Sequence, residues 1–185
     1  MEVKKQVLFI HSAGPQGFNQ GSSGLIRFLE KELDGDFELL YPEMPDPENP
    51  VYTDWKDQLA VEFTKLRGGA ILAGHSLGGS ALLKFLSEEP VKGPFPALFL
   101  VASPVWGLEK DWKKEDFTLT DDFATKLPEI SRIVLFHSTG DNIVPYTHLE
   151  KYTELLPSAA VKSLLGDSHL FEKGLKELSE EMKSL

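Results

Sequence analysis

Short apolar runs alternate with amphipathic helical patterns along this chain, and that alternation limits its fold more than any other feature. Unbroken apolar runs are typical of strands that are buried on both faces of a sheet. Strands that alternate with helices are joined by right-handed crossovers, which produce a parallel sheet. The pattern therefore predicts an α/β three-layer sandwich, with a parallel sheet of about six strands and helices on both faces. The expected strands are residues 7–10, 37–41, 70–74, 97–101, 133–136 and 160–164.

Helices are expected between these strands, wherever apolar residues recur every three or four positions. The first follows Ser22 and Ser23, which are suitable capping residues, and the second has Trp55 on its apolar face. The last helix is expected to carry four apolar residues on one face: Phe171, Leu175, Leu178 and Met182. No linker or repeat interrupts the pattern, so we expect residues 1–185 to form a single domain.

The composition is that of an ordinary globular protein, with 41% apolar and 26% charged residues. The net charge of −10 repels phosphate groups, so we expect neither a nucleic-acid partner nor binding to an anionic membrane. The absence of cysteine excludes disulfides and a thiol nucleophile, and it fits a cytoplasmic location. No stretch approaches the ~20 apolar residues that span a bilayer, and nothing in the sequence indicates a protein partner.

The residues after each strand are the candidates for a site, because active sites of parallel α/β sheets lie beyond the carboxyl ends of the strands. The third expected strand ends in Gly74-His75-Ser76-Leu77-Gly78, and a helical pattern follows. This is the G-x-S-x-G pattern of a nucleophile elbow, in which a serine occupies a tight turn between a strand and a helix. An ordinary glycine-rich turn is the alternative, since the bare pattern occurs by chance in about one such chain in twenty. The position between a strand and a helix favours Ser76 as the nucleophile.

Two further strand ends supply the partners that a nucleophilic serine needs. Asp141 follows the fifth expected strand and is suited to accept a hydrogen bond from an imidazole, although a turn aspartate beside Gly140 is the alternative. Of the five histidines, only His169 follows the last strand, and it would act as the general base. Asp167 is a rival acid, but its position suits it better to support the loop. The order Ser76, Asp141, His169 is that of an α/β hydrolase.

An oxyanion site is expected around the loop after the first strand. Two N–H donors would hold a tetrahedral intermediate, one from the residue after the nucleophile and one from this loop. They are Leu77 and either Ser12 or Ala13, of which we favour Ala13. His11 and His75 flank this position, so we expect both to contact the substrate.

Residues 103–123 follow the fourth expected strand and carry Trp106, Trp112 and Phe117 among charged residues. This position often holds a lid or pocket wall, so Trp106 is a further candidate substrate contact. A surface excursion whose aromatic side chains pack into the core explains the pattern equally well. Because a chain of this length has little material for a lid, we expect an open site and small or flexible substrates.

Cofactor motifs are missing from the sequence. No G-x-G-x-x-G follows the first strand, and no P-loop lysine motif or H-E-x-x-H zinc motif occurs. We therefore expect a reaction that uses no cofactor and no metal.

The combination of motifs resembles the small serine hydrolases of the retinoblastoma-binding protein nine-like family. The resemblance rests on four segments: Gly74 to Gly78, Met44-Pro45-Asp46-Pro47 followed by Trp55, Ser138 to Pro145, and His169. It implies a compact α/β-hydrolase fold without a large cap domain, and a triad of Ser76, Asp141 and His169. This chain has His11-Ser12 where a His-Gly pair is common in the family.

The function predicted from these features is that of a carboxylesterase-like serine hydrolase. It would cleave an ester, thioester or amide bond of a small molecule through an acyl-enzyme. Two alternatives stay open on sequence alone. One is an acyltransferase with the same triad, and the other is a non-catalytic protein-binding module that retains the fold.

Overall fold

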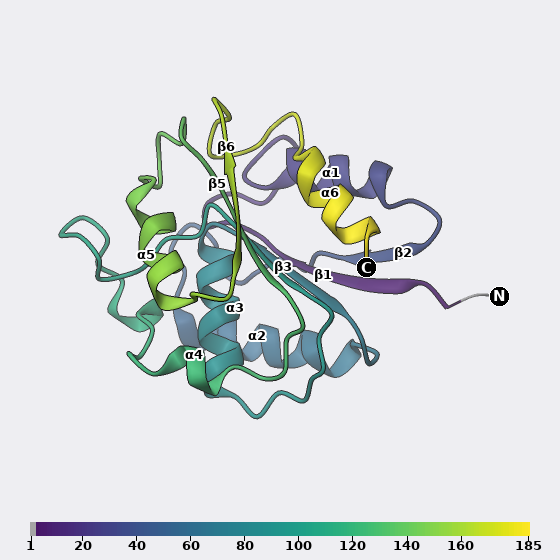
Figure 1. The fold of residues 1–185 in the computed structure, drawn as a ribbon, viewed down its shortest axis with the longest axis horizontal. Coiled ribbons are helices and arrows are strands. Elements are labelled where there is room, and N and C mark those ends of the chain that lie inside the picture. The colour runs from purple at the N-terminus through teal and green to yellow at the C-terminus, as the bar shows by residue number, and fades with distance from the viewer. Residues whose placement is uncertain (1–2) are drawn as a thin grey trace.

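Six parallel strands form one sheet in the order β2-β1-β3-β4-β5-β6, in a computed structural model that describes residues 3–185 (Figure 1). The strands are β1 Lys5–Ile10, β2 Phe37–Leu40, β3 Ile71–His75, β4 Leu98–Val101, β5 Ile133–Ser138 and β6 Ala160–Leu164. Each expected strand lies within two residues of these bounds. The predicted α/β three-layer sandwich is confirmed.

The helices form a layer on each side of the sheet (Figure 1). They are α1 Ser23–Glu32, α2 Tyr52–Lys65, α3 Leu77–Glu88, α4 Phe123–Lys126, α5 Thr147–Leu155 and α6 Lys176–Lys183, with a 3-10 turn at Glu115–Phe117. Alternate residues of β1 show how the two layers arise, because successive strand side chains point to opposite faces. Leu8 and Ile10 pack with α2, α3 and α5, whereas Val7 and Phe9 pack with α1 and α6.

The strand order reverses at β1, and this reversal positions the site. The chain places β2 on one side of β1 and β3 on the other. Ile10 at the end of β1 is in register with Gly74 of β3, so the loops after these two strands begin side by side. An open crevice at the carboxyl ends of the strands is the expected result of such a reversal.

The last helix is shorter than expected. It begins at Lys176, and Phe171 and Leu175 precede it. Phe171 has a φ of 46°, which an α-helix cannot contain. Both residues are nevertheless buried beside Leu178 and Met182, because the turns before α6 fold back onto the same face of the sheet. The apolar spacing therefore identified buried residues correctly but placed two of them in the wrong element.

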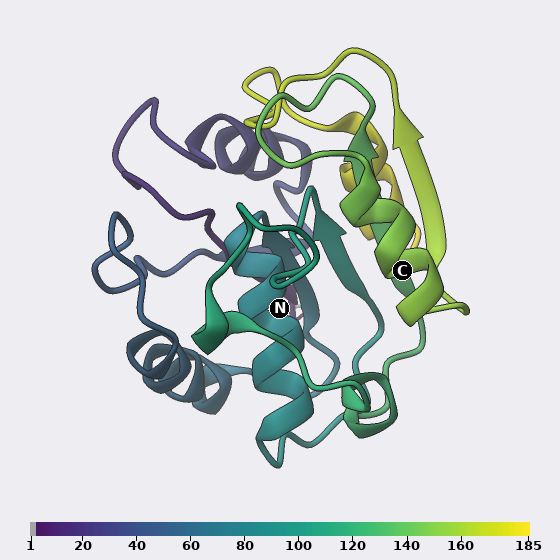
Figure 2. The same ribbon diagram turned by 90° about the vertical axis from the view of Figure 1, so that its left-hand side faces the viewer.

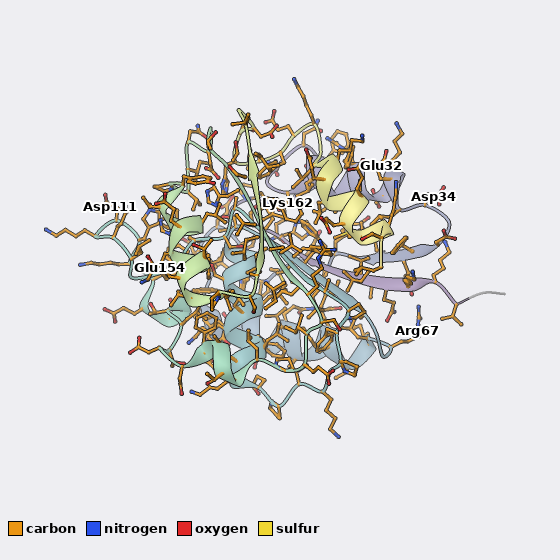
Figure 3. All side chains as sticks on the ribbon, viewed as in Figure 1. Glu32, Asp34, Arg67, Asp111, Glu154 and Lys162 are labelled. Atoms are coloured by element: carbon orange, nitrogen blue, oxygen red, sulfur yellow. The ribbon has the colours of Figure 1, made fainter. Side chains whose placement is uncertain are left out.

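Figure 3 labels six charged residues, of which Glu32, Asp34, Arg67 and Asp111 lie toward the outline of the molecule in this view, whereas Lys162 lies on β6 near its centre. Among residues 3–185, no helix has both the length and the apolar character that crossing a membrane requires.

Candidate active site

Ser76 stands in the turn between β3 and α3, with backbone angles that few serines adopt. Its φ is 52° and its ψ is −123°, and a positive φ in a residue with a Cβ is strained. Two backbone hydrogen bonds hold the turn in this conformation. The Ser76 N–H donates to the Val101 carbonyl oxygen at 2.8 Å, and the Gly79 N–H donates to the Ser76 carbonyl oxygen at 3.0 Å. Ser76 is partly exposed, whereas the first eleven residues of α3 that follow it are buried.

The glycines around Ser76 are required by the close approach of α3 to the sheet. A Cβ on Gly74 would lie 2.6 Å from Gly79 Cα, and a Cβ on Gly78 would overlap the carbonyl oxygens of Ile10 and His11. Contacts this short do not occur for real Cβ atoms, so α3 can take its position only with glycine at these sites. The glycines of the nucleophile-elbow pattern are therefore present because α3 packs closely against the sheet, as the pattern predicts.

Asp141 and His169 meet at the same edge of the sheet. His169 Nδ1 lies 2.7 Å from Asp141 Oδ2, and the Asp141 side chain is fully buried. Asp141 Oδ1 accepts hydrogen bonds from the N–H groups of Ile143 (2.9 Å) and Val144 (2.8 Å). Burial raises the pKa of Asp141, but the hydrogen bond and charge of His169 and the two N–H groups together hold that pKa below its usual value. The ionised carboxylate therefore accepts the Nδ1 proton, which leaves Nε2 of His169 as the basic nitrogen.

The aromatic ring of His169 lies against the elbow. Its centroid is 5.0 Å from that of His75, the residue before Ser76. The hydrogen bonds that His169 makes run to Asp141 and to the His75 ring, and none found among residues 3–185 joins it to Ser76 Oγ. Bonds of this kind often tighten only when a substrate binds.

His75 does not occupy the position expected for a substrate contact. It is 0% exposed, its Nε2 lies 2.8 Å from the His169 carbonyl oxygen, and its Nδ1 lies 2.9 Å from Ser22 Oγ. Both ring nitrogens are therefore occupied, and the ring cannot touch a substrate in this conformation. Burial lowers the pKa of His75 to about 3, with a further contribution from the charge of His169, so the ring is neutral. The expected contact between His75 and the substrate is therefore wrong, because the ring is buried and both its nitrogens have partners inside the protein.

The two candidate donors of the loop after β1 are distinguished by their hydrogen bonds. The Ser12 N–H donates to Ser22 Oγ at 2.9 Å, so it is not free for an oxyanion. The Ala13 N–H has no hydrogen bond to any residue in the range 3–185, and Ala13 is exposed. Leu77 is the first residue of α3, where an N–H has no partner within the helix.

This loop is held in place by the proline-rich segment after β2. The Gly14 N–H donates to the Pro47 carbonyl oxygen at 2.6 Å, and Gln16 Oε1 accepts from the Met44 N–H at 2.8 Å. Trp55 is fully buried, and its Nε1 donates to the Pro45 carbonyl oxygen at 2.9 Å. The Met-Pro-Asp-Pro segment therefore acts as a brace for the loop after β1.

His11 is also buried. Only 4% of it is exposed, and its ring lies 6.3 Å from the rings of Phe9 and Tyr41. Burial lowers the pKa of His11, although the Tyr41 backbone and the charge of Glu43 oppose this effect. Because the ring is buried, the structure does not support the expected contact between His11 and the substrate.

Residues 103–122 form a packed wall that crosses over α3 (Figure 2). Ser80 Oγ (2.7 Å) and Tyr152 Oη (2.9 Å) both donate to the Pro104 carbonyl oxygen, which anchors the start of the segment. Trp106 is partly buried, and its ring packs 5.3 Å from that of Trp112 and 6.4 Å from that of Phe117. The aromatic side chains thus fix this wall to the body of the protein.

Two residues of the site could not be found from sequence patterns. Ser22 occupies the N-cap position of α1, but its side chain makes no capping bond and turns instead toward Ser12 and His75. Gln16 joins the loop after β1 to Met44, 28 positions further on. Both contacts join residues far apart in the sequence, so no local sequence pattern predicts them.

The parallel sheet, the strained elbow and the Asp–His pair at the strand ends define the α/β-hydrolase class. The chain belongs to the serine hydrolase family, whose model matches residues 33–185. It is 26% identical over 179 residues to the Bacillus subtilis (strain 168) protein named "Putative hydrolase YdeN", covering 95% of this chain and 92% of that protein.

Solved structures support the fold. The ydeN gene product of B. subtilis superposes with a TM-score of 0.82 at 23% identity, covering 98% of both chains. CarC, a serine hydrolase involved in carbazole degradation, gives a TM-score of 0.74 at 14% identity, covering 97% of this chain and 90% of CarC. The family match and the B. subtilis relative show that the protein is an enzyme, a serine hydrolase, so the non-catalytic alternative is not supported.

Proposed function

We propose that Ser76, His169 and Asp141 form a catalytic triad that cleaves ester, thioester or amide bonds of small molecules through an acyl-enzyme. One observation carries the proposal: a buried 2.7 Å hydrogen bond joins His169 Nδ1 to Asp141 Oδ2, and the His169 ring lies beside the strained elbow that presents Ser76. A serine hydrolase needs an activated serine, and among residues 3–185 no second serine combines a positive φ with a position between a strand and a helix.

In the first half of the reaction, Ser76 Oγ attacks the carbonyl carbon while His169 Nε2 accepts the hydroxyl proton. The carbonyl oxygen becomes an oxyanion, which the N–H groups of Leu77 and Ala13 stabilise. When the intermediate collapses, the bond to the leaving group breaks and His169 returns the proton to the departing alcohol, thiol or amine. The product is an ester of Ser76 with the acyl group.

In the second half, His169 removes a proton from water, whose oxygen attacks the acyl carbon. Collapse of the second oxyanion intermediate breaks the bond to Ser76 Oγ, which takes the proton back from His169 and releases a carboxylic acid. Asp141 holds His169 in the tautomer that this cycle requires and stabilises the imidazolium that forms twice in it.

The surroundings of Ser76 favour a small or flexible substrate. The wall of residues 103–122 is fastened to α3 and α5 through Ser80 and Tyr152, and its two tryptophans, Trp106 and Trp112, are partly exposed. Within the serine hydrolase family, we assign the chain to the retinoblastoma-binding protein nine-like branch, on the strength of the Met44–Pro47 brace and the compact fold. We further propose that the enzyme works in the cytoplasm.

The proposal is tested by hydrolysis of a p-nitrophenyl acetate, a short-chain thioester and an aryl amide by the wild type and by Ser76→Ala. Ser179→Ala is the matched control, because Ser179 is 0% exposed and bonds only within its own helix region, to Lys176. We expect turnover of at least one substrate by the wild type and by Ser179→Ala, and none above background by Ser76→Ala. Equal turnover by Ser76→Ala would refute the role of Ser76.

A further inference from the structure

A buried chain of hydrogen bonds connects three of the loops that build the site. Ser22 Oγ lies 2.9 Å from the Ser12 backbone nitrogen, 3.2 Å from Ser12 Oγ and 2.9 Å from His75 Nδ1. His75 Nε2 lies 2.8 Å from the His169 carbonyl oxygen. All four residues are at most 4% exposed. The chain thus runs from the loop after β1, through the start of α1 and the elbow, to the loop that carries His169.

The two bonds of the His75 ring have directions that follow from its neutral state and from its partners. A carbonyl oxygen only accepts, so Nε2 of His75 carries the proton that is donated to His169. The ring is neutral, so Nδ1 is an acceptor and the Ser22 hydroxyl must donate its one proton to it. Ser22 Oγ then accepts from the Ser12 N–H and from the Ser12 hydroxyl.

We propose that Ser22 and His75 are positioning residues, which hold the oxyanion loop and the His169 loop in place relative to Ser76. The inference rests on the proposed triad but concerns residues that do not touch the reacting atoms. His75 is covalently next to Ser76 and holds the backbone of His169, so it couples the nucleophile to its base. Ser22 fixes the Ser12 N–H, while the next N–H, that of Ala13, forms no hydrogen bond among residues 3–185.

Further contacts show that the His75 ring is built into this position. It packs against the His169 ring at 5.0 Å and against the edge of Phe171 at 6.0 Å between centroids. Phe171 itself has a φ of 46°, so a residue with a strained backbone packs against the His75 ring. A backbone strain of this kind persists only where its surroundings over-determine it.

Loss of the network should reduce catalysis more than it reduces binding. A displacement of about 1 Å in a catalytic group can lower a rate about 100-fold. Ser22→Ala removes both the donor to His75 and the acceptor for Ser12, so we expect kcat to fall about 10- to 100-fold while KM changes little. His75→Leu removes both bonds of the ring and should do the same. His75→Gln retains a donor at the position of Nε2, so it should recover part of the lost kcat.

The experiment compares kcat, KM and thermal unfolding of the wild type, Ser22→Ala, His75→Leu, His75→Gln and the double variant Ser22→Ala/His75→Gln. Ser179→Ala again serves as the control for the loss of a buried hydroxyl. The proposal predicts a kcat loss that is larger in His75→Leu than in His75→Gln, and a double variant that is less impaired than the product of the two single losses.

Folded Ser22→Ala and His75→Gln that both turn over at the wild-type kcat would overturn the proposal, and so would additive losses in the double variant. If His75→Leu does not fold, these two variants and their combination decide the question. A wild type that is inactive on every substrate and unreactive with a fluorophosphonate would instead count against the triad, so the two failures are distinguishable.

Discussion

Stability should depend on pH through His75, and the size of the effect follows from its burial. Burial and the nearby charge of His169 lower the pKa of His75 from an ordinary value of 6.5 to about 3, with opposing contributions from the His169 backbone and Asp141. Between these values the unfolded chain binds a proton that the native protein does not. Stability is therefore complete above about pH 6.5 and is lost as the pH falls toward about 3.

The loss of unfolding free energy that His75 alone causes follows from the size of its pKa shift. Between about pH 7.5 and pH 5, a shift of this size lowers the free energy of unfolding by about 2 kcal/mol. The pKa values of His11, His137 and His148 are also lowered, chiefly by burial, so the whole protein should lose more than this. These three residues stay in His75→Gln, and the difference between wild type and variant therefore isolates His75.

Urea unfolding of wild type and His75→Gln, followed by tryptophan fluorescence at a series of pH values, measures this difference. The variant is expected to be less stable at pH 7.5 but to lose about 2 kcal/mol less than the wild type on acidification to pH 5. Parallel pH dependences would refute the reasoning, because they would mean that the native protein protonates His75 as readily as the unfolded chain does.

Three further predictions concern the triad, the elbow and the core. Asp141→Asn should fold but lose about 10³- to 10⁴-fold in kcat, because the amide no longer enforces the required tautomer of His169; a smaller loss than about tenfold would contradict this role. Gly78→Ala should destabilise the protein by about 2 kcal/mol or more in urea unfolding, whereas Gly68→Ala, where a Cβ meets nothing within 4 Å, should change little. Equal effects in the two glycine variants would argue against close contact at the elbow. Trp55→Ala should cost about 3–5 kcal/mol, since it empties a fully buried site; a loss below about 1 kcal/mol would contradict the packing described for it.

Much of the fold could be predicted because its causes are local. Apolar runs such as 98–101 are buried on both faces, and this double burial is visible in the sequence as an uninterrupted apolar stretch. The elbow could also be predicted from the sequence. Close contacts require glycine at positions 74 and 78, which lie at fixed distances along the chain from Ser76. The pairing of His169 with Asp141 followed from topology, since parallel strands carry both residues to one edge of the sheet.

The predictions that were wrong concern residues whose positions depend on contacts between distant segments. His75 was expected to face the substrate because it adjoins Ser76, yet strand alternation and the Ser22 hydroxyl place it inside the protein. Phe171 was assigned to a helix on its spacing, but a positive φ excludes it from one. Tertiary packing decides both cases, and periodicity carries no information about it.

The central claim is that Ser76 is an activated nucleophile with His169 as its base, and covalent labelling tests it most directly. The wild type, Ser76→Ala and His169→Ala would be treated with a fluorophosphonate probe at neutral pH, and the adduct located by mass spectrometry. We expect a phosphonyl adduct on Ser76 of the wild type, none on Ser76→Ala, and greatly slowed labelling of His169→Ala. A folded wild type that stays unlabelled, or that is labelled at another residue, would contradict it.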